Sequence, residues 1–263
     1  MKKLIIYLFL LLNPSIMIYS QSGKELLVLD NYLIPVNEKG ATIGRFVTRT
    51  GEAISLASDT SGLFVLDKQG YIKLRKDVEL STTSPIRFGI KIKSNLGEES
   101  FELVKVDFIR NGVIAHRGAW KNHDASQNSL KALKTAIDMG CEGSEFDVWL
   151  SSDNKVILSH DPVIGGKKVE ECTAEELFRI PLKNGDYLPG LEDYISVIKG
   201  QNKTRLVLEV KTSQKGKERS EAVAEESVKI VHKMNAQAWT DYITFSFDAA
   251  KRIRELDPAA RIL

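Results

Sequence analysis

From Asn111 onward, short apolar segments alternate with longer segments in which apolar residues recur at helical spacing. In SQNSLKALKTAIDMG, Leu130, Leu133 and Ile137 fall on one face of a helix that ends at Gly140. Helices are predicted likewise at TAEELFRI, GLEDYISVIK, ERSEAVAEESVKIVHKM and DAAKRIREL. The short segments predict strands at GVIAHRG, EGSEFDVWL, KVILSH, TRLVLEVK, YITFSF and the final RIL. This alternation predicts a parallel sheet with helices packed outside it.

The chain before Asn111 follows a different pattern. Between Glu25 and Asp107, apolar and polar residues alternate with period two in short runs such as GLFVLD, GYIKLR and IRFGIKIKS. About seven such runs, separated by turn residues, predict a β-sandwich over residues 24–110. The succession of segments from Ala41 to Asn95 loosely resembles a cadherin repeat, without the acidic calcium-linker pattern. We expect a spacer or interaction module whose partner is unknown.

The first twenty residues have the layout of a targeting segment. Lys2 and Lys3 precede the apolar run Leu4–Leu12, which predicts a secretory signal peptide over residues 1–20 with cleavage after Ser20. The run is far shorter than the roughly 20 residues that span a bilayer, so no transmembrane anchor is expected after cleavage. A short uncleaved anchor is the alternative. The prediction is an exported protein, periplasmic, secreted or held at the cell surface.

Length and charge exclude several classes of protein. A chain of 263 residues with 43% hydrophobic residues has room for more than one domain. The formal net charge is +2 and becomes zero without Lys2 and Lys3, so the basic footprint of a nucleic-acid-binding protein is missing. Cys141 and Cys172 are too few for a disulfide framework and are expected to remain thiols.

Charged residues interrupt two of the predicted strands at alternate positions. Glu145 and Asp147 share one face of SEFDVWL, and Glu209 and Lys211 share one face of LVLEVK. Two carboxylates held this close repel each other, and burial adds to the cost of ionising both. A divalent cation removes that repulsion, and three carboxylates suit Ca²⁺ or Mg²⁺ better than zinc. A solvated strand edge and a weak ion pair are the simpler explanations.

Two of the four histidines stand at the ends of predicted strands. His116 is followed by Arg117, and His160 by Asp161. In a parallel barrel the carboxyl ends of the strands form the catalytic face. Histidine exchanges protons near neutral pH, and arginine offers a planar fork that matches phosphate oxygens. Either residue alone is more often a surface hydrogen-bonding group, but together with the acids they predict hydrolysis of a phosphate ester.

These segments resemble the glycerophosphodiester phosphodiesterase family. The motifs AHRG, SEFDVWLSSDNKVILSHDP, GDYLPGLEDYI, LVLEVK and ITFSFDAAKRIRELDP follow the order of that family from Gly112 to the last residue. The resemblance implies a TIM-type (β/α)₈ barrel over residues 111–263. It also implies cleavage of glycerophosphodiesters, a small-molecule substrate class, to glycerol 3-phosphate and an alcohol.

The resemblance also implies roles for seven residues. The divalent-cation ligands, Ca²⁺ or Mg²⁺, fall on Glu145, Asp147 and Glu209, the catalytic histidines on His116 and His160, and the phosphate-contacting positions on Arg117 and Lys211. One histidine would remove a proton from the attacking water or hydroxyl while the other protonates the leaving oxygen. Which histidine does which stays open, as does a cyclic phosphate intermediate.

Two departures from the family pattern bear on these expectations. Many members carry Pro-Glu-Asn-Thr where this chain has SQNS, so Gln127 replaces an acid, with consequences expected for metal binding or glycerol contacts. Up to RIL only six barrel strands are counted, so we expect either a fragment of a longer gene product or a barrel that stops after its sixth strand. The alternative functions are a secreted binding protein whose barrel has lost catalysis and a phospholipase D-like activity on intact lipids.

Overall fold

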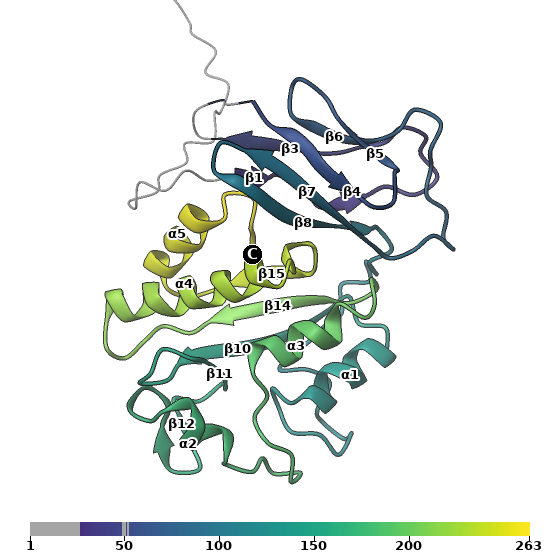
Figure 1. The fold of residues 1–263 in the computed structure, drawn as a ribbon. Coiled ribbons are helices and arrows are strands. Elements are labelled where there is room, and N and C mark those ends of the chain that lie inside the picture. The colour runs from purple at the N-terminus through teal and green to yellow at the C-terminus, as the bar shows by residue number, and fades with distance from the viewer. Residues whose placement is uncertain (1–26, 49–50, 52) are drawn as a thin grey trace, which may run out of the picture.

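The computed structural model describes residues 27–48, 51 and 53–263. The predicted signal peptide, residues 1–20, lies outside the described residues. Two parts of the chain stack on each other, a β-rich N-terminal part and an α/β C-terminal part (Figure 1). Of the helices in the described ranges, none combines the length and the apolar character that a membrane crossing requires.

Two four-stranded sheets build the N-terminal part. The first has the order β1-β3-β6-β5, with bounds Leu27–Leu29, Thr42–Thr48, Tyr71–Leu74 and Phe64–Leu66. The second has the order β2-β8-β7-β4, with bounds Leu33–Ile34, Gly97–Lys105, Arg87–Ser94 and Ser55–Asp59.

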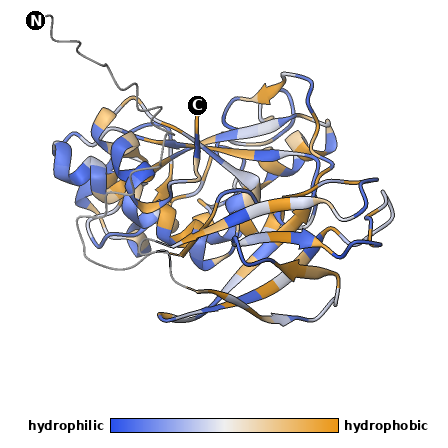
Figure 2. Ribbon diagram, turned by 90° about the horizontal axis from the view of Figure 1, so that it is seen from above, coloured by the Kyte–Doolittle hydropathy of each residue, from blue (hydrophilic) through white to orange (hydrophobic). Residues whose placement is uncertain are grey.

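The two sheets face each other across a core of aromatic and aliphatic side chains. Exposed and buried residues alternate along β7, and polar and apolar residues alternate visibly along such strands (Figure 2). Between the sheets, the Phe46 and Phe101 ring centroids lie 4.9 Å apart and those of Phe64 and Phe88 5.7 Å apart. This is the packing that period-two alternation predicts for a sandwich. The resemblance to a cadherin repeat stays a prediction.

A six-stranded sheet forms the centre of the C-terminal part. Its order is β11-β10-β14-β15-β16, and β9 also pairs with β10. The bounds are Ile114–Ala115 (β9), Gly143–Leu150 (β10), Val156–Leu158 (β11), Arg205–Val210 (β14), Thr240–Ile243 (β15) and Arg261–Ile262 (β16). All six strands that the sequence predicted are therefore present. β10 and β14 are buried along their whole length, which explains their nearly continuous apolar sequences.

One strand differs in direction from the prediction. β11 pairs antiparallel with β10, with Val148 opposite Leu158, whereas the sequence pattern predicted a parallel strand. The reason is the short connection between the strands, because a parallel crossover needs a dozen or more residues and only a hairpin fits here. The amino-terminal end of β10 pairs with β9 up to Ser144, and its carboxyl-terminal end pairs with β11 from Val148 onward.

Helices cover the sheet as the spacing of apolar residues predicted. Their bounds are Leu130–Asp138 (α1), Ala174–Phe178 (α2), Leu191–Ile198 (α3), Lys217–Lys233 (α4) and Phe247–Leu256 (α5). An excursion between β11 and α3 adds a small hairpin and a 3₁₀ turn before α2. These elements are β12 (Val163–Ile164), β13 (Lys167–Lys168) and η1 (Val169–Glu171). A second 3₁₀ turn, η2 (Gln237–Trp239), precedes β15.

The sandwich packs against the amino ends of the sheet strands. The buried Asn202 side chain, just before β14, donates a hydrogen bond to the Lys105 carbonyl at 2.8 Å, and the Ile109 amide donates to the Lys203 carbonyl at 2.8 Å. At the first residue of β14, the Arg205 guanidinium lies 5.0 Å from the centre of the Phe108 ring.

Candidate active site

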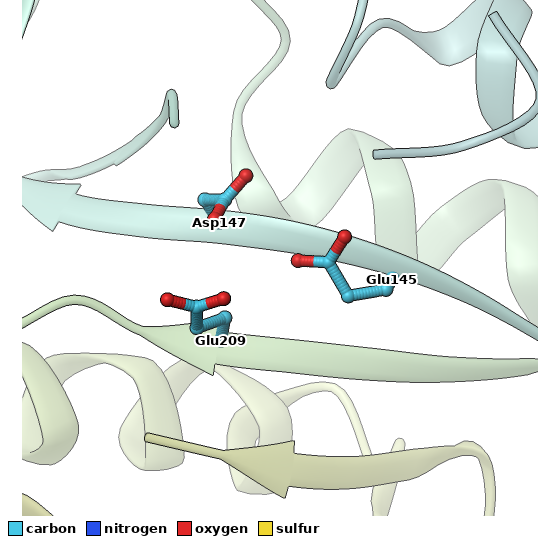
Figure 3. A group of neighbouring side chains, drawn as sticks. All are labelled: Glu145, Asp147 and Glu209. Atoms are coloured by element: carbon cyan, nitrogen blue, oxygen red, sulfur yellow. The ribbon is translucent and has the colours of Figure 1, made fainter. Parts of the chain in front are cut away.

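Three carboxylates meet on the central strands. One carboxylate oxygen each of Glu145, Asp147 and Glu209 lies within 4.8 Å of the other two (Figure 3). Glu145 and Asp147 share a face because they are two residues apart on β10, and Glu209 on β14 stands opposite Asp147 in the parallel register. All three residues are at least nine-tenths buried. The structure thus brings the three predicted metal ligands together.

Burial and mutual repulsion make this group of acids costly to ionise. Burial, followed by the charge of Asp147, raises the pKa of Glu145 to about 7. The Oε1 atom of Glu145 is buried without a hydrogen-bond partner among the described residues. An unpaired buried carboxylate oxygen beside two further carboxylates is the donor set that a hard divalent cation seeks. The residues present therefore fit such a cation.

Lys211 places an ammonium group between two of the acids. Its Nζ atom lies 3.1 Å from Asp147 Oδ1 and 2.7 Å from Glu209 Oε1. Burial lowers the pKa of Lys211, but its hydrogen bonds to Glu209 and Asp147 outweigh burial, so the pKa is raised overall. Lys211 therefore stays charged at this site, as a group that contacts an anion must.

Arg117 reaches the same acids from the loop after β9. It adopts the left-handed conformation with φ of 61°, and its backbone amide donates to Glu145 Oε2 at 2.7 Å. Its Nε atom lies 3.9 Å from Asp147 Oδ2, and its Nη1 atom donates to Gln127 Oε1 at 2.9 Å. Gln127 was expected to affect metal binding or glycerol contacts. In the structure its side chain accepts a hydrogen bond from the guanidinium of Arg117, and the expected effect stays a prediction.

Asn128 is a site residue that the sequence analysis missed. It is buried, its Nδ2 atom donates to Asp147 Oδ2 at 3.0 Å, and its Oδ1 atom accepts from the Asp147 amide at 3.4 Å. The motif SQNS held one sequence signal for this residue. Asparagine tolerates the left-handed backbone conformation better than most residues, and Asn128 adopts it with φ of 58°. Asn128 orients one of the predicted metal ligands.

The two predicted histidines follow the two strands that pair with β10 on either side of the acids. His116 follows β9, and its Nε2 atom lies 4.0 Å from Glu145 Oε2. His160 follows β11, and its Nδ1 atom pairs with Asp161 Oδ1 at 2.8 Å. Because β11 is antiparallel, His160 does not stand at the carboxyl rim of a parallel strand as predicted.

Backbone hydrogen bonds fix both loops to β10 at the height of the acids. The Gly118 amide donates to the Glu145 carbonyl at 3.0 Å, and the Ser159 amide donates to the Asp147 carbonyl at 3.1 Å. The segment of β10 between its pairings with β9 and β11 is the one that carries the acids. Each histidine lies within two residues of one of these anchored amides.

Comparison with known proteins assigns this half of the chain to a family. Residues 116–263 match the sequence model of the glycerophosphoryl diester phosphodiesterase family. A glycerophosphodiester phosphodiesterase from Caldanaerobacter subterraneus is 25% identical over 162 residues, which are 57% of this chain and 64% of that protein.

Solved structures show the same fold. A glycerophosphodiester phosphodiesterase from Parabacteroides distasonis is 41% identical, with a TM-score of 0.55 over 57% of this chain and 63% of that one. An Oleispira antarctica phosphodiesterase, solved in complex with its product sn-glycerol-3-phosphate, is 24% identical, with a TM-score of 0.50 over 57% of this chain and 64% of that one. The matched region has the predicted TIM-type barrel fold, and the chain spans somewhat less than two thirds of the length of these relatives.

Proposed function

The chain belongs to the glycerophosphoryl diester phosphodiesterase family, and on this premise we propose that it hydrolyses glycerophosphodiesters in a metal-dependent reaction. Water adds to phosphorus, the bond from phosphorus to the alcohol oxygen breaks, and glycerol 3-phosphate and the alcohol leave. The observation that carries the proposal is the convergence of three buried carboxylates with Lys211 and Arg117 on the central strands. Such a group has no use in an ordinary sheet core, where it is costly.

We propose that Glu145, Asp147 and Glu209 hold one divalent cation, Ca²⁺ or Mg²⁺. When bound, such a cation neutralises phosphate charge and polarises the phosphorus–oxygen bonds. Arg117 and Lys211 would contact the phosphate oxygens, since both already direct donors at the carboxylate group.

His116 and His160 would carry the protons. The Nδ1 atom of His160 pairs with Asp161, which leaves Nε2 to exchange a proton with the substrate. One histidine removes a proton from the attacking oxygen and the other donates one to the leaving oxygen.

We also propose that the protein is exported, on the basis of Lys2, Lys3 and the apolar run that follows them. Cell fractionation with an antibody against the sandwich tests this proposal. Recovery of the uncleaved chain from the cytoplasm alone would contradict it.

The enzymatic proposal is tested by release of glycerol 3-phosphate from glycerophosphoglycerol, with and without EDTA. EDTA should abolish the activity, and Mg²⁺ or Ca²⁺ should restore it. Glu209→Gln should lower kcat/KM by about 100-fold or more and weaken cation binding in calorimetry. The matched control is Glu192→Gln, an exposed acid on α3, which should leave both unchanged. Full activity in EDTA would overturn the proposal.

A further inference from the structure

A cavity of about 320 Å³ lies beside the acid group. Three of its lining residues belong to the site, because Asn128 donates to Asp147, Gln127 accepts from Arg117, and His160 is a proposed proton carrier. Its size falls at the lower end of the range for small-molecule pockets, about 300–1,000 Å³. The cavity is therefore placed to hold the part of a phosphodiester that extends from the reacting phosphate.

The wall opposite the site comes from the excursion between β11 and α3. Its apolar members are Val163, Ile164, Ile180, Pro181, Leu182 and Leu188. A Cβ atom on Gly165, in the turn between β12 and β13, would lie 2.7 Å from Ile180 Cγ2, so the hairpin rests directly on this side chain. The wall is thus a packed apolar surface that belongs to the excursion and not to the barrel strands.

The charges around the cavity disfavour a cationic ligand. Asp161, the one carboxylate among the lining residues, already pairs with His160. Trp120 is the one aromatic residue among them, and the Lys121 ammonium lies 5.7 Å from the centre of its ring. Lys183 places a positive charge at the cavity itself and forms no ion pair with any described residue. A quaternary ammonium is held best by several aromatic faces or a free carboxylate. This lining offers a single indole, which Lys121 already approaches, and a single carboxylate, which already pairs with His160.

We infer that this cavity receives the alcohol side of the diester and favours an uncharged, apolar alcohol over a cationic one such as choline or ethanolamine. The inference rests on the proposed function. It names the substrate class that the reaction would select: glycerophosphodiesters of alkyl or similarly apolar alcohols. Hydrolysis of such a diester releases glycerol 3-phosphate and a neutral alcohol, with the proton on the alcohol oxygen supplied by one of the two histidines.

The test measures hydrolysis of two substrates, glycerophosphohexanol and glycerophosphocholine, by the full chain in the presence of Mg²⁺ or Ca²⁺. The expected kcat/KM for the hexyl diester is about tenfold or more above that for the choline diester, since one methylene in an apolar pocket already discriminates by about tenfold. Equal or better use of glycerophosphocholine would overturn the inference while leaving the proposed function intact. Cleavage of neither diester, nor of glycerophosphoglycerol, would overturn both.

Two variants test the cavity itself. Ile180→Gln should reduce the preference for the hexyl diester about fivefold or more, because it places an amide in the apolar wall. Lys121→Gln should raise kcat/KM for glycerophosphocholine several-fold, a gain that a folding defect does not produce. Leu96→Gln, the same type of change at a half-exposed turn of the sandwich, is the control and should keep the parent preference. An unchanged preference in both cavity variants would contradict the inference.

Discussion

Glu145 links the pH of the solution to the stability of the metal-free chain. Its pKa is raised from 4.5 to about 7 by burial and by Asp147, so the folded protein holds this proton more tightly than the unfolded chain does. Between pH 4.5 and 7 the unfolded state is ionised and the folded state is not. The free energy of unfolding should therefore fall as pH rises through this window, by up to about 3 kcal/mol, and level off above pH 7.

Urea unfolding in EDTA at several pH values measures this fall. Glu145→Gln has no carboxyl group to titrate, so it should lack this contribution and exceed the parent in stability at pH 8. If the two proteins lost stability in parallel between pH 4.5 and 7, the shifted group would not be Glu145.

Gln127 acts on the site through Arg117. Gln127→Ala removes the acceptor that holds Nη1 of Arg117, so the guanidinium loses its fixed orientation toward the acid group. A hydrogen bond to a charged group contributes roughly 1.5–3 kcal/mol, so KM should rise about tenfold while kcat changes less. Steady-state kinetics with glycerophosphoglycerol measure this split. Gln127→Glu keeps an acceptor and should restore KM, and a failure of this rescue would argue against the positioning role.

At the scale of elements, Gly118 sets how closely the loop after β9 approaches α1. It has φ of 74°, and a Cβ atom there would lie 2.6 Å from the Ala132 Cβ. Gly118→Ala should therefore lower the free energy of unfolding by about 2–4 kcal/mol. The loss combines an unfavourable backbone conformation for alanine with a steric clash against α1. Gly112→Ala is a matched control, because Gly112 has φ of 73° and no atom within 4 Å of the added Cβ.

Thermal and denaturant unfolding of the two variants separate these contributions. The control should lose only about 1 kcal/mol. Equal losses in both variants would mean that the contact with α1 is not tight. Because His116 and Arg117 precede Gly118, its variant should also lower kcat.

The elements of the barrel half could be predicted from sequence, but not all of their directions. Continuous apolar runs identified β10 and β14, and the i, i+2 spacing of Glu145 and Asp147 placed both on one face, which the structure confirms. The direction of β11 was wrong because an apolar run alone does not record orientation. The short connection between β10 and β11 indicated the antiparallel direction, because a parallel crossover needs a dozen or more residues.

The missed side chains have a different cause. Asn128 precedes a helix and lies in a loop, where no periodicity indicates which way a side chain points. Its contact with Asp147 joins residues far apart in sequence. Within the excursion, the close approach of Gly165 to Ile180 likewise joins residues that are not neighbours in sequence. Such contacts depend on the three-dimensional packing of several segments, which local pattern does not encode.

In the whole molecule, the sandwich contacts the amino ends of the central strands, and the acid group lies farther along these strands. The sandwich contacts the chain just before and at the start of β14, and Glu209 stands near the end of that strand. A period-two pattern in the sandwich sequence indicated that one face of each strand is buried, but not that the barrel half would cover part of the surface. The contact of the Phe108 ring with Arg205 thus lies four residues before Glu209 on β14.

The buried hydrogen bond from Asn202 to the Lys105 carbonyl tests that separation. Asn202→Ala leaves this carbonyl without its partner in a buried interface, so the free energy of unfolding should fall by about 1–3 kcal/mol. KM for glycerophosphoglycerol should stay unchanged, because the substituted residue lies at the amino end of β14. Gln69→Ala, an exposed amide of the sandwich, should alter neither quantity. A rise in KM for Asn202→Ala, measured well below its unfolding temperature, would show that the interface with the sandwich is coupled to the site, because strain would then pass along β14 to Glu209.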